Sequence, residues 1–552
     1  MVDTKLTAAA EPAVDGRERA DARVRELVER WGAREVRLAA ALCDDHPADE
    51  IAFSLVRPGL SVRDLTFGEL RERSERFAAA LADMGVGPGD RVATLMAKSV
   101  DLVSVLVGIW RRGAVHVPLF TAFAPPAIDL RLTGSDARVV VADADQRAKL
   151  AAGAGRQIVV AGGAASGDLG LEDLLARADT GIAPESVSGE DPFLLIFTSG
   201  TTGTPKGVPV PVRGIGGFVS YMEYGYDLRD ADVYWNIADP GWAYGLYYAI
   251  TGPLAIGRGS ILACAPFSPA LTWQIMSELR VTNFAGAPTV YRALRNDPTP
   301  VPGDLALRCL SSAGEPLNPD VVAWAEQAFG VPIRDHYGQT ELAMVIGNCW
   351  HPELRDALKP GSMGRPLPGW TVAVLRDDAD EIAPAGTVGR LAVDRTASPA
   401  MPFTAYHDAP ERTAERMSAD GRWYLTGDVA RCDEDGYFHF ASRDDDVIIM
   451  AGYRIGPFEV ESTLVQHPAV AEAAVIGAPD ELRGEVVEAF VVLSEGHAAG
   501  DELAGELKQH VKANYAAHAY PRTVHFVDAL PKTPSGKIQR YVLRESRGAA
   551  RR

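Results

Sequence analysis

The residue types between positions 198 and 207 could hold a phosphate group. This stretch contains three glycines, five hydroxyl side chains, one proline and one lysine. Glycines let a turn approach a phosphate closely, and successive backbone N–H groups in such a turn form a concave anion site. Hydroxyls of Ser199, Thr201 and Thr202 and the charge of Lys206 would add donors to that site. The spacing does not match a Walker A motif, and the alternative is a surface loop rich in glycine and threonine.

Two further stretches carry side chains suited to a nucleotide. Tyr337 could stack on a base, Thr340 could donate to a phosphate, and Glu341 is a hard oxygen ligand of the kind that Mg²⁺ takes. Asp428 ends an expected strand and, together with Arg443, could bind ribose hydroxyls. Each stretch also has a plain structural alternative, because polar turns and strand-to-helix loops are common.

Two turn-rich segments add candidates. The turn Gly314-Glu-Pro316 follows the apolar, strand-like residues 305–310, and α/β proteins bind ligands at such strand ends. Residues 531–540 contain two prolines and a glycine and should form an exposed loop that presents Lys537. A lysine on a loop of a small mobile domain could be delivered into a cleft. The alternatives are an ordinary turn and a solvated basic loop.

These segments must be positioned by regular elements, and the pattern predicts an α/β fold. Amphipathic helices are expected over 22–42 and 65–81, and strand, helix and strand recur from residue 90 onward. We predict a large N-terminal domain with mostly parallel sheets and a small mobile α+β C-terminal domain. The expected parts are a disordered N-terminus at 1–20, the large N-terminal domain at 21–442, a hinge at 443–446 and the C-terminal domain with Lys537 at 447–552.

Composition limits the possible partners. The 552 residues are too many for one core, and a net charge of −19 argues against nucleic acid or an anionic membrane as the main partner. No run is long enough for a membrane span, and the start of the chain lacks a signal pattern. Five scattered cysteines without a CxxC pair predict reduced thiols, no zinc site and a cytoplasmic location.

Taken together and in this order, the motifs resemble the adenylate-forming superfamily of acyl-CoA synthetases, adenylation domains and luciferases. Within it the chain is most similar to acetyl-CoA synthetases and medium-chain acyl-CoA synthetases, through residues 238–242, 314–319 and 452–461. The resemblance implies ATP, Mg²⁺ and coenzyme A as cofactors. A carboxylic acid would attack the α-phosphate of ATP to give acyl-adenylate and pyrophosphate. The small domain would then swing, and the thiol of coenzyme A would displace AMP. A homodimer stays an open expectation.

The resemblance also implies individual roles. Lys537, Thr340 and Glu341 would be catalytic, with Lys537 bridging the acid and the α-phosphate and Glu341 binding Mg²⁺ beside the ATP phosphates. Asp445 would be the hinge residue. The implied ATP- and AMP-binding residues are Thr198, Ser199, Gly200, Thr201, Thr202, Gly203, Lys206, Gly314, Glu315, Pro316, Asp335, His336, Tyr337, Gly338, Gln339, Thr340, Asp428 and Arg443. Those implied for coenzyme A are Ala451, Gly452, Arg454 and Lys512.

One position bears on the size of the acid. Acetyl-CoA synthetases carry a tryptophan just after the aromatic residue of the 335–341 motif, whereas this chain has Gly338 there. Removing an indole opens a cavity, so we expect a short- or medium-chain or small aromatic acid, and a Gly338→Trp exchange should favour acetate. Tyr244 could refill part of the space. The expected acyl pocket comprises Trp242, Ala243, Tyr244, Tyr247, Ala313 and Gly338.

Two alternatives remain at this point. Close relatives usually have an Asn-x-Ser stretch where this chain has Ile449-Met-Ala451, near the expected path of pantetheine. The activated group could therefore pass to an amine or a carrier protein in a biosynthetic pathway. A non-catalytic nucleotide-binding protein is the second alternative, and four intact residues argue against it: Lys206, Glu341, Asp428 and Lys537.

Overall fold

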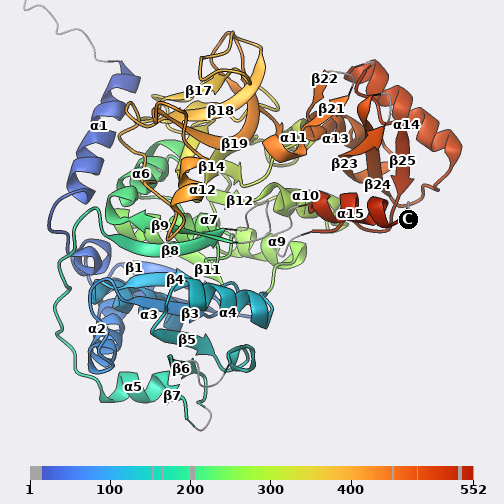
Figure 1. Cartoon of the computed structure of the whole chain (residues 1–552). Coiled ribbons are helices and arrows are strands. Elements are labelled where there is room, and N and C mark those ends of the chain that lie inside the picture. Colours follow the sequence, from blue (N-terminus) through green and yellow to red (C-terminus); the bar gives the residue numbers. More distant parts are fainter. Residues whose placement is uncertain are drawn as a thin grey trace, which may run out of the picture.

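The computed structural model describes residues 15–151, 155–164, 167–198, 205–450, 453–480, 483–516, 518–532 and 538–550. A large α/β body contains most of them, and a smaller α+β unit formed by the C-terminal residues lies beside it (Figure 1). The predicted fold class is confirmed. The body is built around several sheets, and their strand order decides which loops come together.

The first sheet of the body has the strand order β7-β6-β5-β3-β4-β8-β9. Its neighbouring strands pair in parallel except for β8 and β9, which are antiparallel and place β9 at the edge. The central strands are apolar on both faces because helices cover the sheet. The strands are β3 (Arg91–Leu95), β4 (Val115–Pro118), β5 (Val139–Asp143), β6 (Gln157–Ala161), β7 (Leu169–Gly170), β8 (Pro192–Thr198) and β9 (Lys206–Pro211).

The second sheet has the order β10-β12-β13-β14-β15-β16. Strands β10, β12, β13 and β14 pair in parallel, so their carboxyl ends meet at one edge. Strands β15 and β16 continue the sheet in antiparallel fashion. The strands are β10 (Tyr234–Asn236), β12 (Asn283–Gly286), β13 (Cys309–Ala313), β14 (Ile333–Gln339), β15 (Ala343–Gly347) and β16 (Arg365–Pro366).

Two smaller sheets complete the body, in the orders β11-β1-β2 and β17-β18-β19-β20. Their strands are β1 (Ile51–Val56), β2 (Val62–Thr66), β11 (Ser260–Ala263), β17 (Val372–Leu375), β18 (Val388–Asp394), β19 (Trp423–Cys432) and β20 (Phe438–Arg443). The register of β19 and β20 places Asp428 opposite Arg443. The two residues predicted to bind ribose are therefore neighbours across one strand pair.

The helices of the body begin at recognisable caps. The side chain of Thr66 accepts from the N–H of Glu69 at the start of α2, and Ser99 does the same for Leu102 in α3. The α-helices are α1 (Gly16–Trp31), α2 (Phe67–Asp83), α3 (Val100–Arg111), α4 (Pro125–Gly134), α5 (Leu171–Arg177), α6 (Ile215–Ser220), α7 (Ala243–Gly245), α8 (Gly252–Ile256), α9 (Pro269–Glu278), α10 (Pro288–Asn296), α11 (Pro319–Phe329) and α12 (Pro410–Ala414). Short 3₁₀ or π segments are η1 (Ala40–Asp44), η2 (Arg147–Lys149), η3 (Val212–Gly214), η4 (Tyr221–Gly225), η5 (Leu246–Thr251) and η6 (Asp444–Asp446).

The C-terminal unit has its own core. Its strands follow the order β22-β21-β24-β23, and β25 pairs in parallel with β24. Val460, Val475 and Leu507, from a helix, a strand and another helix, are fully buried in it. The elements are β21 (Ile448–Met450), β22 (Tyr453–Ile455), α13 (Pro457–Val465), β23 (Val470–Asp480), β24 (Gly484–Leu493), α14 (Asp501–Asn514), β25 (Thr523–Phe526) and α15 (Arg540–Ala550).

The start of the chain differs from the prediction. Helix α1 begins at Gly16, and Ala20 is fully buried, so residues 16–20 are not part of a disordered N-terminus. Burial of Val24 and Leu27 against the body explains why this polar helix is stable. The helix predicted over 22–42 ends at Trp31, because Gly32 interrupts it.

Two predictions from composition can be compared with the fold. No helix among the described residues is both long and apolar enough to cross a membrane. All five cysteines lie within the described ranges and are free thiols. Burial raises the pKa of Cys43, Cys309 and Cys349 to about 12, so these thiols stay protonated at neutral pH.

A buried ion pair ties η1 to α3. The side chain of Arg111 is fully buried, and it donates to both carboxylate oxygens of Asp44, at 2.8 and 2.5 Å, and to the hydroxyl of Ser74. The Asp44 side chain is only 11 % exposed. Removing one partner of such a pair leaves an uncompensated buried charge.

We therefore predict that Asp44→Ala lowers the free energy of unfolding by about 3–5 kcal/mol. The matched control is Asp230→Ala, because Asp230 pairs with Arg258 but its side chain is 86 % exposed. That variant should lose less than about 1 kcal/mol. Thermal unfolding of both variants checks the difference, and equal stability losses would contradict the role given to burial.

Candidate functional site

The site forms where the parallel strands of the second sheet end. The segments that follow β10, β13 and β14 are 238–242, 314–316 and 340–341, and all three were singled out in the sequence. These strands and β12, which lies between β10 and β13, all run parallel, so the three segments lie at the same sheet edge. Strands β8 and β9, which flank most of residues 198–207, belong to the first sheet.

Asp428 is the centre of a buried hydrogen-bond cluster. One of its carboxylate oxygens accepts from the Tyr337 hydroxyl at 2.6 Å and from the side-chain amide of Gln339 at 2.7 Å. The Arg443 guanidinium lies 3.9 Å from the other oxygen. Burial raises the pKa of Asp428, and the nearby charge of Arg443 opposes that shift. The predicted base and ribose residues Tyr337, Asp428 and Arg443 are thus brought together.

Gln339 has a structural part in this cluster. Its amide nitrogen also donates to the carbonyl of Thr426 at 3.0 Å, and its oxygen accepts from the hydroxyl of Tyr424 at 3.3 Å. Its polar atoms are therefore bonded to the protein. Gln339, predicted as a nucleotide contact, holds β14 against β19.

Asp335 presents a buried carboxyl group beside the 314–316 turn. One of its side-chain oxygens has no hydrogen-bond partner among the described residues. Burial raises the pKa of this carboxyl well above its usual range, although the N–H groups of Leu317 and His336 favour the charged form. A buried polar atom without a partner is a position where a ligand can bind. This fits the prediction of Asp335 on the base side.

The 314–316 turn offers open backbone. Gly314 has a φ of +98°, and a Cβ there would meet nothing within 4 Å. The carboxylate of Glu315 is bonded to Arg292 at 2.7 Å and to the Thr289 hydroxyl at 2.8 Å. The charge of Glu315 is therefore balanced within the protein, and the turn itself is held in place.

His336 is a correction to the predicted nucleotide contacts. Its ring is buried, one nitrogen bonds the Tyr221 hydroxyl at 2.5 Å, and the other bonds the Asn348 carbonyl at 3.1 Å. Because a carbonyl can only accept, the nitrogen facing Asn348 carries the proton and the other accepts from Tyr221. Burial lowers the pKa of His336 to about 4, so the ring is neutral at physiological pH. Its side chain is committed to the protein core.

Glu341 and Lys206 lie around one tyrosine. The Tyr406 hydroxyl donates to Glu341 at 2.7 Å, and the Lys206 ammonium is 4.9 Å from the centre of the Tyr406 ring. Partial burial and the nearby charges of Arg416 and Arg412 lower the pKa of Lys206. These contacts bring together two residues predicted for Mg²⁺ and phosphate.

Sequence reasoning missed Tyr406, Arg412 and Arg416. They belong to the segment around α12, whose alternating acidic and basic residues are typical of a solvated helix. Nothing in their local pattern indicates a site. Their position beside Glu341 follows only from the way this segment packs on β19, where Met417 bridges to Tyr424.

The predicted acyl pocket is lined by tyrosines. Tyr244 is half-buried, and its hydroxyl accepts from that of Tyr226 at 2.9 Å. Tyr247 is buried, stacks on Phe218 at 4.2 Å and donates to the Thr340 carbonyl at 3.0 Å. Tyr247 therefore supports the loop that carries Thr340, and Tyr244 is the tyrosine of the predicted pocket that keeps some exposure.

Other predicted pocket residues differ in packing. Trp242 contacts the rings of Phe120 and Phe123, each at 5.4 Å, and its indole N–H has no partner among the described residues. Ala243 is half-buried next to it, whereas Ala313 is buried at the end of β13.

Gly338 brings a second correction. Strand β14 has an irregularity between Tyr337 and Gly338, and Ala343 on the facing strand has a φ of +65°. In this geometry a Cβ at Gly338 would overlap the carbonyl of Ala343. A Gly338→Trp exchange therefore does not simply fill a pocket, because the hairpin backbone would first have to move.

Several predicted residues cannot be placed. Ser199, Gly200, Thr201, Thr202, Gly203, Ala451, Gly452 and Lys537 lie outside the described residues, as do the side chains of Asp445 and Arg454. Thr198 ends β8 and pairs with Lys206 across the hairpin. Lys512 lies on α14, and its ammonium is 4.0 Å from the centre of the Tyr520 ring.

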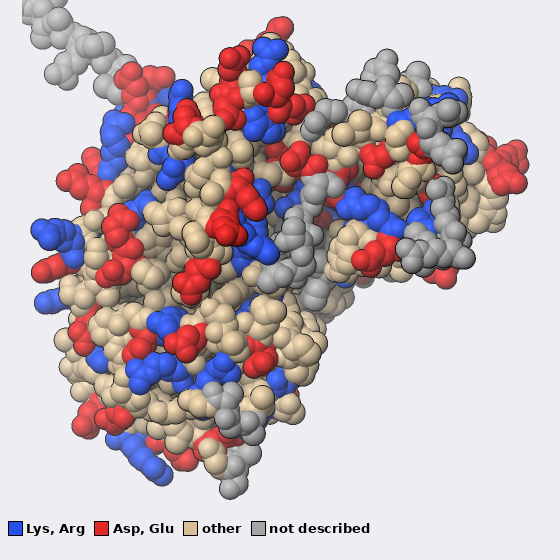
Figure 2. Space-filling model, viewed as in Figure 1, with Lys and Arg blue, Asp and Glu red and all other residues tan. Residues whose placement is uncertain are grey.

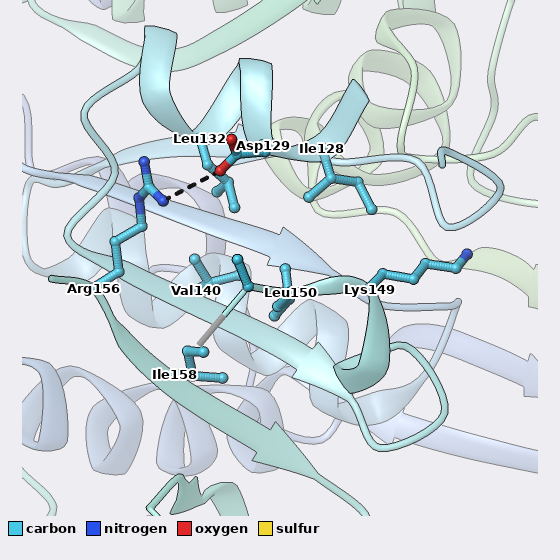
Figure 3. A pocket seen from close by; sticks show the side chains of 9 residues that line it. Ile128, Asp129, Leu132, Val140, Lys149, Leu150, Arg156 and Ile158 are labelled. Carbon is cyan, nitrogen blue, oxygen red and sulfur yellow. Dashed lines mark ion pairs between the residues drawn. The ribbon is translucent and has the colours of Figure 1, made fainter. Parts of the chain in front are cut away.

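A depression elsewhere on the body is not part of the candidate site. Figure 3 shows it between α4 and the strands β5 and β6, with Arg156 3.8 Å from Asp129 at one side. None of its lining residues was predicted as a site residue; they are Ile128, Asp129, Leu132, Val140, Lys149, Leu150, Ala151, Arg156 and Ile158.

Known families and structures match almost the whole chain. A family model described as AMP-binding enzyme matches residues 40–398, and one described as AMP-binding enzyme C-terminal domain matches residues 459–537. The acetyl-coenzyme A synthetase of Bacillus subtilis is 39 % identical over 489 residues, which cover 87 % of this chain and 84 % of the relative.

Solved structures agree. An acyl-CoA synthetase of Brucella canis has a TM-score of 0.75 at 42 % identity, covering 98 % of this chain and 100 % of the other. A benzoate CoA ligase of Burkholderia xenovorans has a TM-score of 0.81 at 32 % identity, covering 92 % of this chain and 99 % of the other. The site described above has side chains suited to a nucleotide, and the family models, the relative and the solved structures agree with it. The chain therefore belongs to the AMP-binding enzyme family and is an AMP-forming acid–CoA ligase.

Proposed function

We propose that the chain activates a carboxylic acid larger than acetate with MgATP and transfers the acyl group to coenzyme A. The larger acid is proposed because the chain has no indole at position 338 that could close the acyl pocket. The observation that carries adenylation is the meeting of two groups of side chains at the end of β14. Tyr337, Asp428 and Arg443 form one group, and Glu341 and Lys206 form the other. One group suits a nucleoside and the other suits its phosphates.

The nucleoside side is proposed from burial and hydrogen-bonding capacity. The Asp428 carboxylate and the Arg443 guanidinium would bind the ribose hydroxyls, as an acceptor and a donor. The base would lie between the ring of Tyr337 and the 314–316 turn, where Asp335 has an oxygen without a partner among the described residues. Fixed groups of this kind orient the nucleotide before reaction.

The phosphate side would hold the leaving group. The carboxylate oxygen of the acid attacks the α-phosphorus, and the bond from that phosphorus to the bridging oxygen of pyrophosphate breaks. Thr340 would contact the α-phosphate, and the 198–207 loop with Lys206 would hold the β- and γ-phosphates. In the second step the thiol of coenzyme A displaces AMP from the acyl-adenylate.

Glu341 fits a magnesium site of the substrate-bound kind. Mg²⁺ usually keeps one or two protein carboxylates and completes its shell with water and phosphate oxygens. Glu341 is a single carboxylate held by Tyr406, and within the described residues no three His, Cys, Asp or Glu side chains cluster to hold a metal. When bound, the ion would neutralise phosphate charge.

The domain boundaries are proposed as 21–442, a hinge at 443–446, and 447–552. Arg443 lies beside Asp428 of the body, at 3.9 Å. Asp446 accepts instead from Arg540 at 3.3 Å and from Arg544 at 2.8 Å, both on α15 of the C-terminal unit. Arg443 is thus bound to the body, whereas Asp446 is bound to the C-terminal unit. This difference favours rotation at the two residues between them, Asp444 and Asp445.

For coenzyme A we propose the C-terminal unit, through Ala451, Gly452, Arg454 and Lys512. Lys512 already lies on an exposed helix of that unit, next to Tyr520. Free coenzyme A is the proposed acceptor, rather than an amine or a carrier protein. A test is whether AMP release from the acyl-adenylate depends on added coenzyme A.

The function as a whole is tested by pyrophosphate exchange. Purified protein is given ATP, Mg²⁺, labelled pyrophosphate and a panel of acids from acetate to benzoate. Exchange should be fastest with an acid larger than acetate. Absence of exchange with every acid would refute adenylation, and the fastest exchange with acetate would refute the proposed acid size.

We predict that Lys537→Ala loses adenylation while it keeps thioester formation. The ammonium would hold the acid and the α-phosphate together, and that task ends once the adenylate exists. Pyrophosphate exchange should fall by about a hundredfold or more, whereas the rate from supplied acyl-adenylate and coenzyme A should stay within about threefold.

The control for Lys537→Ala is Lys532→Ala. Lys532 belongs to the same C-terminal segment, but its ammonium is paired with Glu472 at 2.7 Å. This variant should retain both half-reactions. Equal losses in the two half-reactions of Lys537→Ala would be evidence against its proposed role.

We predict that Tyr244→Ala shifts preference toward bulkier acids. The change removes the half-buried ring from the proposed acyl pocket without touching the β14–β15 backbone, unlike a change at Gly338. Each added methylene that finds room is worth about 1–3 kcal/mol, so kcat/KM for acids with added methylenes should rise at least about tenfold relative to the smallest active acid.

The matched variant is Tyr244→Phe, which keeps the ring and removes only the partner of the Tyr226 hydroxyl. Its acid ranking should follow the wild type. An unchanged ranking in Tyr244→Ala, measured as kcat/KM across the acid panel, would remove Tyr244 from the pocket.

A further inference from the structure

Arg416 occupies a fixed position close to the proposed phosphate site. It follows α12, and its backbone carbonyl accepts from the N–H of Leu425 at 2.7 Å. The next residue, Met417, bridges to Tyr424. These bonds attach the Arg416 backbone to the beginning of β19, the strand that also carries Asp428. The backbones of Arg416 and Asp428 are therefore fixed relative to each other.

The side chain of Arg416 reaches the centre of the site. Its guanidinium lies against the backbone of Gly427, where an added Cβ would overlap one of its nitrogens. It also lies next to the hydroxyl of Tyr406, the group that donates to Glu341. Lys206 lies over the ring of the same tyrosine, at 4.9 Å. Arg416 and Lys206 thus approach one another around Tyr406.

Positive charge is concentrated here in a protein that is acidic overall. The charges of Arg416 and Arg412 act on Lys206 and, with burial, lower its pKa, while Glu341 and Glu415 offset part of the repulsion. Charged side chains of both signs gather over α12 at the centre of the face in Figure 2. If Glu341 binds Mg²⁺, its charge is used by the metal. Lys206, Arg412 and Arg416 then leave an excess of positive charge beside Glu341. Such an excess suits a polyanion.

We propose that Arg416, together with Lys206, binds the pyrophosphate that leaves during adenylation. This rests on the proposed function. When the bond between the α-phosphorus and the bridging oxygen breaks, the electron pair stays on that oxygen, and negative charge grows on pyrophosphate. A guanidinium presents paired donors that match phosphate oxygens, and it remains charged at any physiological pH. Pyrophosphate takes no part in thioester formation, so Arg416 has no role in that step.

The test compares Arg416→Ala and Arg416→Lys with the wild type, using magnesium pyrophosphate as the probe. The measurements are the KM for pyrophosphate in the exchange reaction, pyrophosphate binding by calorimetry, and thioester formation from supplied acyl-adenylate and coenzyme A. Losing hydrogen bonds to a charged ligand should raise the KM and weaken binding at least about tenfold in Arg416→Ala. Arg416→Lys should lie in between, and the thioester rate should stay within about twofold.

The control is Arg395→Ala. Arg395 is an exposed arginine just after β18 of the same sheet, and it donates to the carbonyl of Gly421 at 2.7 Å. Its loss should change none of the three measurements, which separates a local contact from a general loss of positive charge. If Arg416→Ala does not fold, Arg416→Lys still has to raise the KM for pyrophosphate.

Two results would overturn the inference. One is an unchanged KM and unchanged binding of pyrophosphate in the Arg416 variants. The other is an equal decline of exchange and thioester formation, which indicates a structural role. A wild-type protein that exchanges no pyrophosphate with any acid would instead refute the proposed function, and calorimetry would still decide whether Arg416 binds pyrophosphate.

Discussion

The carboxylate of Asp428 is the interaction on which the arrangement of the site depends. It accepts from Tyr337 and Gln339 on β14 and lies beside Arg443 at the end of β20. One buried charge thereby joins the sheet that ends in the catalytic segment to the sheet that leads into the hinge. Leaving such a group without partners is costly, so each of the three partners favours the packing of these strands. A ligand that binds Asp428 would therefore also lie next to Arg443, the first residue of the proposed hinge.

The phosphate side follows a different electrostatic rule. An acidic protein that binds a strongly anionic nucleotide needs local positive charge, and here cations are gathered in a small area beside Glu341. Lys206, Arg412 and Arg416 come from the β9 edge and the α12 segment, which are far apart in sequence. Their mutual repulsion is tolerated because Glu341 and Glu415 lie among them. Binding of a polyanion would relieve that repulsion, which is the physical reason to propose phosphate for this side of the site.

Motifs in the sequence were sufficient to predict the α/β class, the parallel sheets and the meeting of Tyr337, Asp428 and Arg443. Short motifs report local conformation and chemistry, and parallel strands bring their ends together. They do not report packing between distant segments, which is why Arg416 was missed and His336 was taken for a ligand contact. Gly338 is instructive in another way. A missing side chain was interpreted as space, but the irregular hairpin brings the Ala343 carbonyl to that place.

Charge pairing also explains how a short hinge can act on a distant lysine. Arg540 is half-buried and bonds both Glu461 of α13 and Asp446 at the proposed hinge. Burial alone would lower its pKa, but the charges of these two acids outweigh that effect and raise it. Lys537 precedes Arg540 by three residues, and the stem of its loop is closed by a bridge between Lys532 and Ile538. Arg540 and Arg544 of α15 both pair with Asp446. If the chain rotates just before Asp446, as proposed, these ion pairs would make α15 follow that rotation.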